Sequence, residues 1–185
     1  MATTLLLGVL LITKHYKLRK DSSSVLDRIV YIQDLALVKY NYTGVIDYKD
    51  NMKFLNLDLP LTGKYFLLKY SGYIKAGVDF SRVKVEVDGK SVHVSIPKPK
   101  ITDTVIDENS VQVYNESENA FNPIKIADYN RTIAQEKNTM IREAVERGIL
   151  TEATERAKLA LTSLLKEMGF ENIDITEEIT IPQYQ

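Results

Sequence analysis

Hydrophobic and polar residues alternate most clearly over residues 83–96, where valine or isoleucine occupies every second position on both sides of Asp88-Gly89. An Asp-Gly pair supplies the positive φ angles of a two-residue turn, so this segment predicts a β-hairpin that turns at Asp88 and Gly89. His93 falls on the polar side of the second strand, where we expect it to face solvent. Pro97 ends that strand because proline has no N–H for a sheet ladder.

Period-two patterns also predict strands elsewhere in the chain. Residues 37–48 form one long strand with a bulge at Gly44, and residues 172–181 form a closing strand. Residues 63–79 are rich in aromatic and β-branched residues, and they predict a strand that bends at Gly72 and Gly77. Shorter or irregular strands are expected over residues 47–62 and 101–114.

Helical spacing of apolar residues predicts three helices. The first covers residues 24–37, with Ser24 in a weak capping box. Two more cover residues 127–147 and 151–168, with Gly148 and Gly169 as stops, and we expect them to fold back on each other as a helical hairpin. Asn122-Pro123 is expected to start the turn before the second helix, because both residue types favour turns.

Together these elements predict one α+β domain over residues 22–185. It combines an N-terminal helix, an antiparallel sheet of about five or six strands, a C-terminal helical hairpin packed on that sheet and a closing strand. Residues 1–21 are a separate apolar and basic segment.

The N-terminal segment leaves two interpretations open. The uncharged run Leu5–Ile12 reaches about twelve residues with its small and hydroxyl neighbours, whereas a spanning helix needs roughly 20. It is therefore either a shortened membrane anchor or a strand or buried segment of a soluble domain. Its basic residues follow the apolar run, which is the wrong order for a signal peptide. By the positive-inside rule alone, they would place the domain on the cytoplasmic side.

Composition narrows the function classes. The 185 residues carry 24 Lys and Arg against 25 Asp and Glu, and this net charge of -1 gives no electrostatic reason to expect nucleic acid as a partner. The absence of cysteine excludes a disulfide framework and a thiol nucleophile. Two isolated histidines argue against an imidazole zinc site. No glycine-rich phosphate loop, dinucleotide motif or hydrolase elbow occurs, so we expect no metal, no cofactor and no identifiable catalytic residue.

Eleven tyrosines are the most unusual compositional feature. Tyr40 and Tyr42 share one face of their predicted strand, and such rows form binding platforms in some proteins. Packing within the sheet is the alternative, and we favour it because tyrosine has a high β propensity. Asp79, followed by Ser81, is well placed to cap a turn before the hairpin.

Four stretches resemble the bacterial domain-of-unknown-function family 4230, over roughly residues 25–175. They are Tyr70–Asp79 (YSGYIKAGVD), Val83–Ile101 (VKVEVDGKSVHVSIPKPKI), Phe121-Asn122-Pro123 and Gly148-Ile149-Leu150. In addition, Val25–Tyr42 (VLDRIVYIQDLALVKYNY) is similar to the family's opening helix and strand. No activity, cofactor or catalytic residue comes with the resemblance. Members of this family typically carry the domain after a single N-terminal membrane anchor, which implies that Leu5–Ile12 is the end, or a shortened form, of that anchor.

We therefore expect a single-pass, membrane-tethered and extracytoplasmic domain without catalytic activity, whose partner is an envelope protein or polymer. Lys75, Asp79 and Asn122 are the candidate ligand-binding residues, expected to converge on a groove at one end of the sheet. Gly72, Gly77, Asp88, Gly89, Pro97 and Pro123 are the expected structural turn residues. The alternatives are a hydrolase that uses carboxylates around Asp79, a soluble oligomeric scaffold, and a cytoplasmic location.

Overall fold

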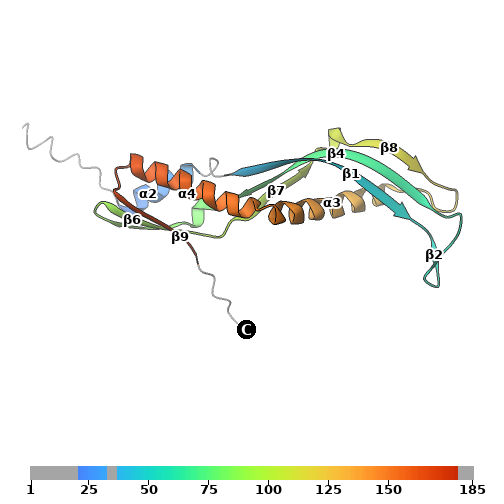
Figure 1. The fold of residues 1–185 in the computed structure, drawn as a ribbon, viewed down its shortest axis with the longest axis horizontal. Coiled ribbons are helices and arrows are strands. Elements are labelled where there is room, and N and C mark those ends of the chain that lie inside the picture. Colours follow the sequence, from blue (N-terminus) through green and yellow to red (C-terminus); the bar gives the residue numbers. More distant parts are fainter. Residues whose placement is uncertain (1–20, 33–36, 179–185) are drawn as a thin grey trace, which may run out of the picture.

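The molecule is an elongated α+β structure with two lobes arranged along a pair of helices (Figure 1). The computed structural model describes residues 21–32 and 37–178. Within these ranges, no helix has the length and apolar character needed to span a bilayer. The apolar run Leu5–Ile12 lies outside the described residues. The predicted α+β class is confirmed, although the strands divide between separate sheets.

The large lobe is built on strand β4, which is the centre of its sheet. β4 pairs antiparallel with β1 along one edge and with β7 and β8 along the other. Nearly every second residue of β4 is buried, which places its hydrophobic side chains on the face that the helices cover. The strands are β1 (Val38–Asp50), β4 (Lys64–Gly77), β7 (Lys100–Ile106) and β8 (Gln112–Ser117).

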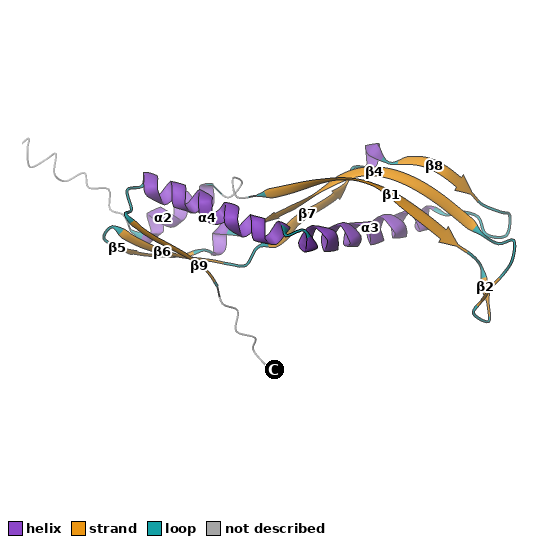
Figure 2. Ribbon diagram, in the orientation of Figure 1, coloured by secondary structure: helices purple, strands orange, loops and turns teal. Residues whose placement is uncertain are grey.

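A small hairpin interrupts the connection between β1 and β4 and extends from the far end of the large lobe (Figure 2). It consists of β2 (Lys53–Phe54) and β3 (Leu57–Asp58), which pair only with each other. The hairpin lies in the segment where the sequence predicted a short strand or an irregular connection.

The small lobe contains a three-stranded sheet of β5 (Lys84–Asp88), β6 (Ser91–Ile96) and β9 (Asn172–Glu177). β5 and β6 form the predicted hairpin, and β9 closes the sheet parallel to β6. The predicted turn was displaced by one residue, because Asp88 pairs with Ser91 and the turn falls at Gly89-Lys90. Gly89 supplies the positive φ angle, at 58°.

Three helices complete the fold: α2 (Ser22–Tyr31), α3 (Ile126–Glu146) and α4 (Ile149–Glu167). α2 begins two residues earlier than predicted, because the Asp21 side chain caps it by accepting from the Ser24 N–H at 2.9 Å. The expected helical hairpin was wrong. α3 and α4 follow each other end to end through Gly148, whose φ of 86° redirects the chain (Figure 1).

The end-to-end arrangement follows from where the two helices bury their apolar side chains. Met140 and Ala144 of α3 pack in the core of the large lobe, whereas Leu161 and Leu165 of α4 pack in the core of the small lobe. The first turns of α4 still contribute to the large lobe through Ile149. Each helix therefore covers a sheet, and α4 belongs to both cores.

The remaining predicted turn residues have different roles. Pro97 follows the last residue of β6, as expected, and Pro123 lies in the loop before α3. Gly72 and Gly77 are not turn residues, since both belong to β4. Gly72 is required for close packing, because a Cβ there would lie 2.3 Å from the Val105 carbonyl oxygen.

We expect Gly72→Ala to lower the free energy of unfolding by about 1–3 kcal/mol, because the sheet backbone must move to accommodate the methyl group. Gly89→Asn is the matched control. Nothing lies within 4 Å of a Cβ at Gly89, and asparagine tolerates its left-handed conformation. Urea unfolding followed by circular dichroism measures both variants, and equal stability of the two would contradict the packing argument.

Candidate functional site

The three predicted ligand-binding residues do not meet in one groove. Asn122 donates to the Thr62 carbonyl at 2.9 Å, just before β4 begins at Lys64. Lys75 lies near the other end of β4, and eleven residues of extended chain separate it from Lys64, which corresponds to roughly 36 Å. Lys75 and Asn122 therefore belong to opposite ends of the large sheet.

Asp79 acts as the cap of the short 3-10 helix η2 (Phe80–Arg82), as its position before Ser81 predicted. Its Oδ1 accepts from the Ser81 hydroxyl at 2.6 Å and from the Ser81 N–H at 3.2 Å, and Lys100 lies 3.5 Å from its Oδ2. The hydrogen bonds from Ser81, with the charge of Lys100, lower the pKa of the Asp79 carboxyl. These contacts suit a carboxylate that stays charged rather than a proton donor.

Three tyrosines of β1 and one of β4 point toward the helices, and their hydroxyl groups donate to acceptors on α3 or α4. Packing is therefore the correct interpretation of Tyr40 and Tyr42, and the binding platform is not. Gly44, predicted as a bulge, instead leaves room for the Tyr70 ring, since β1 and β4 pair without a register shift. The hydroxyl–acceptor pairs are Tyr40–Glu152, Tyr42–Met140 (carbonyl), Tyr48–Asp128 and Tyr70–Glu136.

These surroundings hold the tyrosines in their neutral form. Burial, followed by the hydrogen bond to Glu136, raises the pKa of Tyr70 well above its ordinary value. Burial and the hydrogen bond to Glu116 raise the pKa of Tyr129 to about 12. A protonated hydroxyl donates to a carboxylate, whereas a tyrosinate would repel it.

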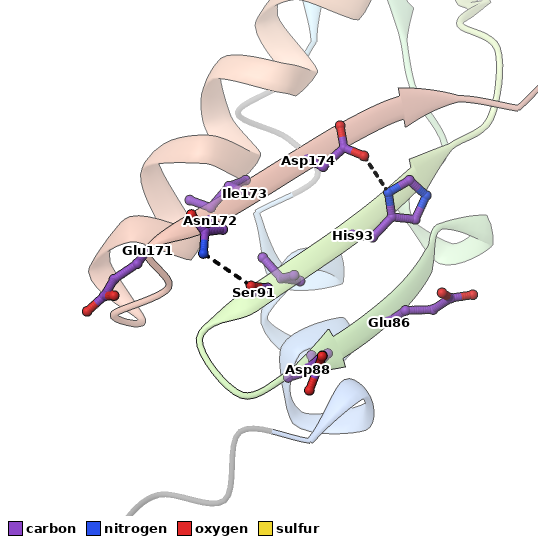
Figure 3. A pocket seen from close by; sticks show the side chains of 10 residues that line it. Glu86, Asp88, Ser91, His93, Glu171, Asn172, Ile173 and Asp174 are labelled. Carbon is purple, nitrogen blue, oxygen red and sulfur yellow. Dashed lines mark hydrogen bonds and ion pairs between the residues drawn. The ribbon is translucent and has the colours of Figure 1, made fainter.

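The outer face of the small sheet carries a row of polar and ionisable side chains. Glu86, His93 and Asp174 occupy neighbouring positions on β5, β6 and β9, and the His93 Nδ1 lies 2.8 Å from the Asp174 Oδ2 (Figure 3). In the next row, the Asn172 amide donates to the Ser91 hydroxyl at 3.2 Å. The surface forms an open depression of about 680 Å³.

This polar face has few features of a catalytic centre. The Asp174 carboxylate orients the His93 ring, but Ser91 is engaged by Asn172 instead of the imidazole. An open sheet surface also does not exclude water from a reaction. In the described parts of the chain, no three metal-ligating side chains are placed to hold an ion.

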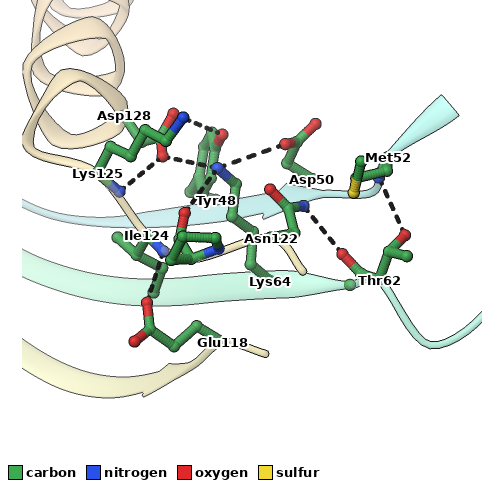
Figure 4. A network of polar contacts seen from close by, with 12 residues as sticks. Tyr48, Asp50, Met52, Thr62, Lys64, Glu118, Asn122, Ile124, Lys125 and Asp128 are labelled. Carbon is green, nitrogen blue, oxygen red and sulfur yellow. Dashed lines mark hydrogen bonds and ion pairs between the residues drawn. The ribbon is translucent and has the colours of Figure 1, made fainter. Parts of the chain in front are cut away.

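A second polar cluster is buried at the far end of the large lobe (Figure 4). Lys64, only 5% exposed, places its Nζ 2.7 Å from the Asp128 Oδ2 and 3.6 Å from the Asp50 Oδ2. Asp128 also accepts from the Lys125 N–H at 2.9 Å, which caps the start of α3. The cluster therefore joins β1, β4 and α3 at one point.

Both charges of this cluster are stabilised by their partners. Burial lowers the pKa of Lys64, but hydrogen bonding to Asp128 and the neighbouring negative groups reverse this, so the net pKa is raised. The hydrogen bond from Lys64, together with the Lys125 N–H, lowers the pKa of Asp128. Since the Lys64 ammonium and the Asp128 carboxylate neutralise each other, the role of the cluster is to hold β1, β4 and α3 together.

Beside this cluster, the far end of the large lobe exposes an unusual number of large hydrophobic side chains. The hairpin of residues 52–61 supplies most of them, and the loop before α3 and the first residue of α3 add the others. We refer to these residues as the apolar end: Met52, Phe54, Leu55, Leu57, Leu61, Phe121 and Ile126.

Two leucines of the apolar end combine exposure with an unfavourable backbone. Leu55 is 81% exposed with φ 48°, and Leu61 is 93% exposed with φ 65°. A left-handed conformation costs a leucine about 1–2 kcal/mol, and the hairpin turn at Leu55-Asn56 normally favours Asn-Gly. Folding alone gives no reason for leucine at these positions.

The sequence did contain a signal for this surface. Leucine occupies every second position over residues 55–61, in a segment that also contains Pro60 and ends at Gly63. The proline and the glycine argue against a buried strand in this segment. Alternating leucines that no neighbouring strand covers form an exposed apolar surface.

Comparison with known proteins identifies one family. The family described as Protein of unknown function (DUF4230) matches residues 27–175. No curated protein and no solved structure matches the chain.

We expect Lys64→Met to lower the free energy of unfolding by about 3–5 kcal/mol, because it leaves the Asp128 carboxylate buried without its cation. The double variant Lys64→Met/Asp128→Asn should recover part of this loss, since asparagine keeps an oxygen for the Lys125 N–H. Urea unfolding measures both. Lower stability of the double variant than of the single one would show that the charge pair is not the cause.

We expect the stability of the protein to fall as the pH rises above about 10, the ordinary pKa of tyrosine. The folded state keeps the protons of Tyr70 and Tyr129 at a pH where the unfolded chain loses them. Tyr129→Phe should therefore make the decline between about pH 10 and 12 shallower in urea unfolding. Tyr114→Phe, on the exposed strand β8, is the control, and identical slopes for Tyr129→Phe and the parent protein would contradict the linkage.

Proposed function

Because the chain belongs to DUF4230, a family of proteins of unknown function, we propose a function from its surface: a non-catalytic interaction domain that presents its apolar end to a partner. The observation that carries this proposal is the exposure of Phe54, Leu55, Leu57 and Leu61 on one projecting hairpin. Clustered apolar exposure of this kind is typical of docking surfaces in soluble domains.

The polar clusters support a binding role over catalysis. Asp79 caps a 3-10 helix, and Asp128 neutralises a buried lysine. His93 is held by one carboxylate on an open surface. A hydrolase would need an acid or base that can reach a substrate in a site shielded from water, and the apolar end offers a surface for binding instead.

The finer proposal is that the segment Leu5–Ile12 tethers the domain to a membrane, with the domain on the extracytoplasmic side. Asp21 precedes α2 in the small lobe, opposite the apolar end (Figure 1). α3 and α4 contain 21 and 19 residues, and at 1.5 Å per residue they extend for about 60 Å. A chain tethered before Asp21 would therefore hold the apolar end at a distance from its tether, where it would meet an envelope protein, a polymer or a second surface.

Site-specific photocrosslinking in the native cells tests the interaction role. A benzoylphenylalanine that replaces Phe54 should form a crosslinked product, because the apolar end contacts its partner in the cell. The same group in place of Leu159, an exposed residue of α4 in the small lobe, should not.

The outcomes separate the parts of the proposal. Absence of any protein or lipid adduct at Phe54 would overturn the interaction role, and equal products at both positions would show contact without a defined surface. Alkaline extraction of the same membranes reports on the tether, since release of the full chain by alkali would overturn the tether and leave the interaction role to the crosslinking result.

A further inference from the structure

The hairpin at the apolar end is shaped as a narrow projection rather than as a groove or a flat face (Figures 1 and 2). Phe54 pairs with Leu57, and both side chains stay largely exposed. Leu55 stands at the turn beyond them. The described elements of the large lobe leave these three side chains uncovered, so an occupant must surround a convex apolar tip.

The hairpin carries one positive and one negative side chain, and both lie behind its tip. Lys53 and Asp58 pair across the two strands, directly behind Phe54 and Leu57. Their formal charges cancel, and the residues between them contain no charged side chain. At about 3.3 Å per strand residue, the Lys53–Asp58 pair lies about 7 Å behind the turn.

We propose, on the basis of the interaction role above, that the tip of this hairpin, Phe54–Leu57, inserts into the interfacial layer of a lipid bilayer. Apolar groups of peripheral membrane elements enter that layer by about 5–10 Å, which matches the length of the uncharged tip. The Lys53–Asp58 pair then remains at the aqueous boundary. A fluid bilayer also accepts a convex tip without a complementary pocket.

Two other apolar side chains of this end add to the surface that meets the bilayer. Phe121 and Ile126 are each 79% exposed, on the loop before α3 and at its first residue. The Asn122 side chain holds that loop to the Thr62 carbonyl at the base of the hairpin. These side chains border the hairpin and meet the membrane surface as it inserts.

The recognised chemistry is uncharged hydrocarbon rather than an anionic headgroup. The Lys53–Asp58 pair offers no net charge to an anionic lipid, and Asp50 lies just before the hairpin. Insertion is therefore expected into zwitterionic phosphatidylcholine vesicles as well as into vesicles that contain anionic lipid.

A tryptophan reporter tests this placement, because the chain has no native tryptophan. In the full chain, Phe54→Trp should show a blue shift of its fluorescence when phosphatidylcholine vesicles are added. Leu159→Trp, exposed on α4 in the small lobe, should show none. This local signal separates the hairpin from any binding by Leu5–Ile12.

A second variant checks that the tip itself drives insertion. Leu55→Asn, placed in the Phe54→Trp background, keeps a residue that accepts a positive φ and removes one apolar side chain. It should weaken vesicle partitioning of the reporter about tenfold, the effect of losing one buried aliphatic side chain.

Each remaining outcome overturns the inference. No shift for Phe54→Trp shows that the tip stays in water, and shifts for both reporters show that the chain lies on vesicles without orientation. A shift that requires anionic lipid contradicts the electroneutral tip. If photocrosslinking at Phe54 captures a protein while vesicles give no shift, the interaction role stands and the lipid partner is wrong.

Discussion

The two helices are fastened to the large sheet by tyrosines, and the shape of the molecule depends on this interface. A tyrosine ring fills space between a strand and a helix, but its hydroxyl must find an acceptor when it is buried. Tyr40, Tyr48 and Tyr70 reach carboxylates on α3 or α4, spaced along the helices. The hydroxyls thereby fix which stretch of helix lies over which stretch of sheet.

This interface also explains why the molecule has two cores instead of one. α3 covers the large sheet, and α4 begins there and continues over the small sheet. Ile149 and Leu161, on the same helix, belong to different cores. Because one continuous helix contributes to both, the lobes have a defined relation, and the small lobe and the apolar end lie at opposite ends of the molecule (Figure 1).

The polar clusters of the molecule are explained by its folding, whereas its exposed leucines are not. The buried pair of Lys64 and Asp128 and the cap at Asp79 are satisfied within the fold, so their chemistry is explained by structure. Leu55 and Leu61 are exposed in conformations that leucine disfavours. Where a residue type disfavours both the exposure and the backbone conformation that the fold gives it, we look for the reason in function rather than in folding.

The sequence by itself determined the local structure, because alternation and helical spacing depend only on neighbouring residues. It determined the hairpin around Gly89, the cap at Asp79, the packing role of the strand tyrosines and the α+β class. Only the tertiary structure decided that α3 and α4 follow end to end, that Lys75 and Asn122 lie far apart, and that Leu55, Leu57 and Leu61 stay exposed. A periodic pattern fixes which face of an element is apolar, but the element that buries this face, or the lack of one, is decided by contacts between residues distant in the sequence.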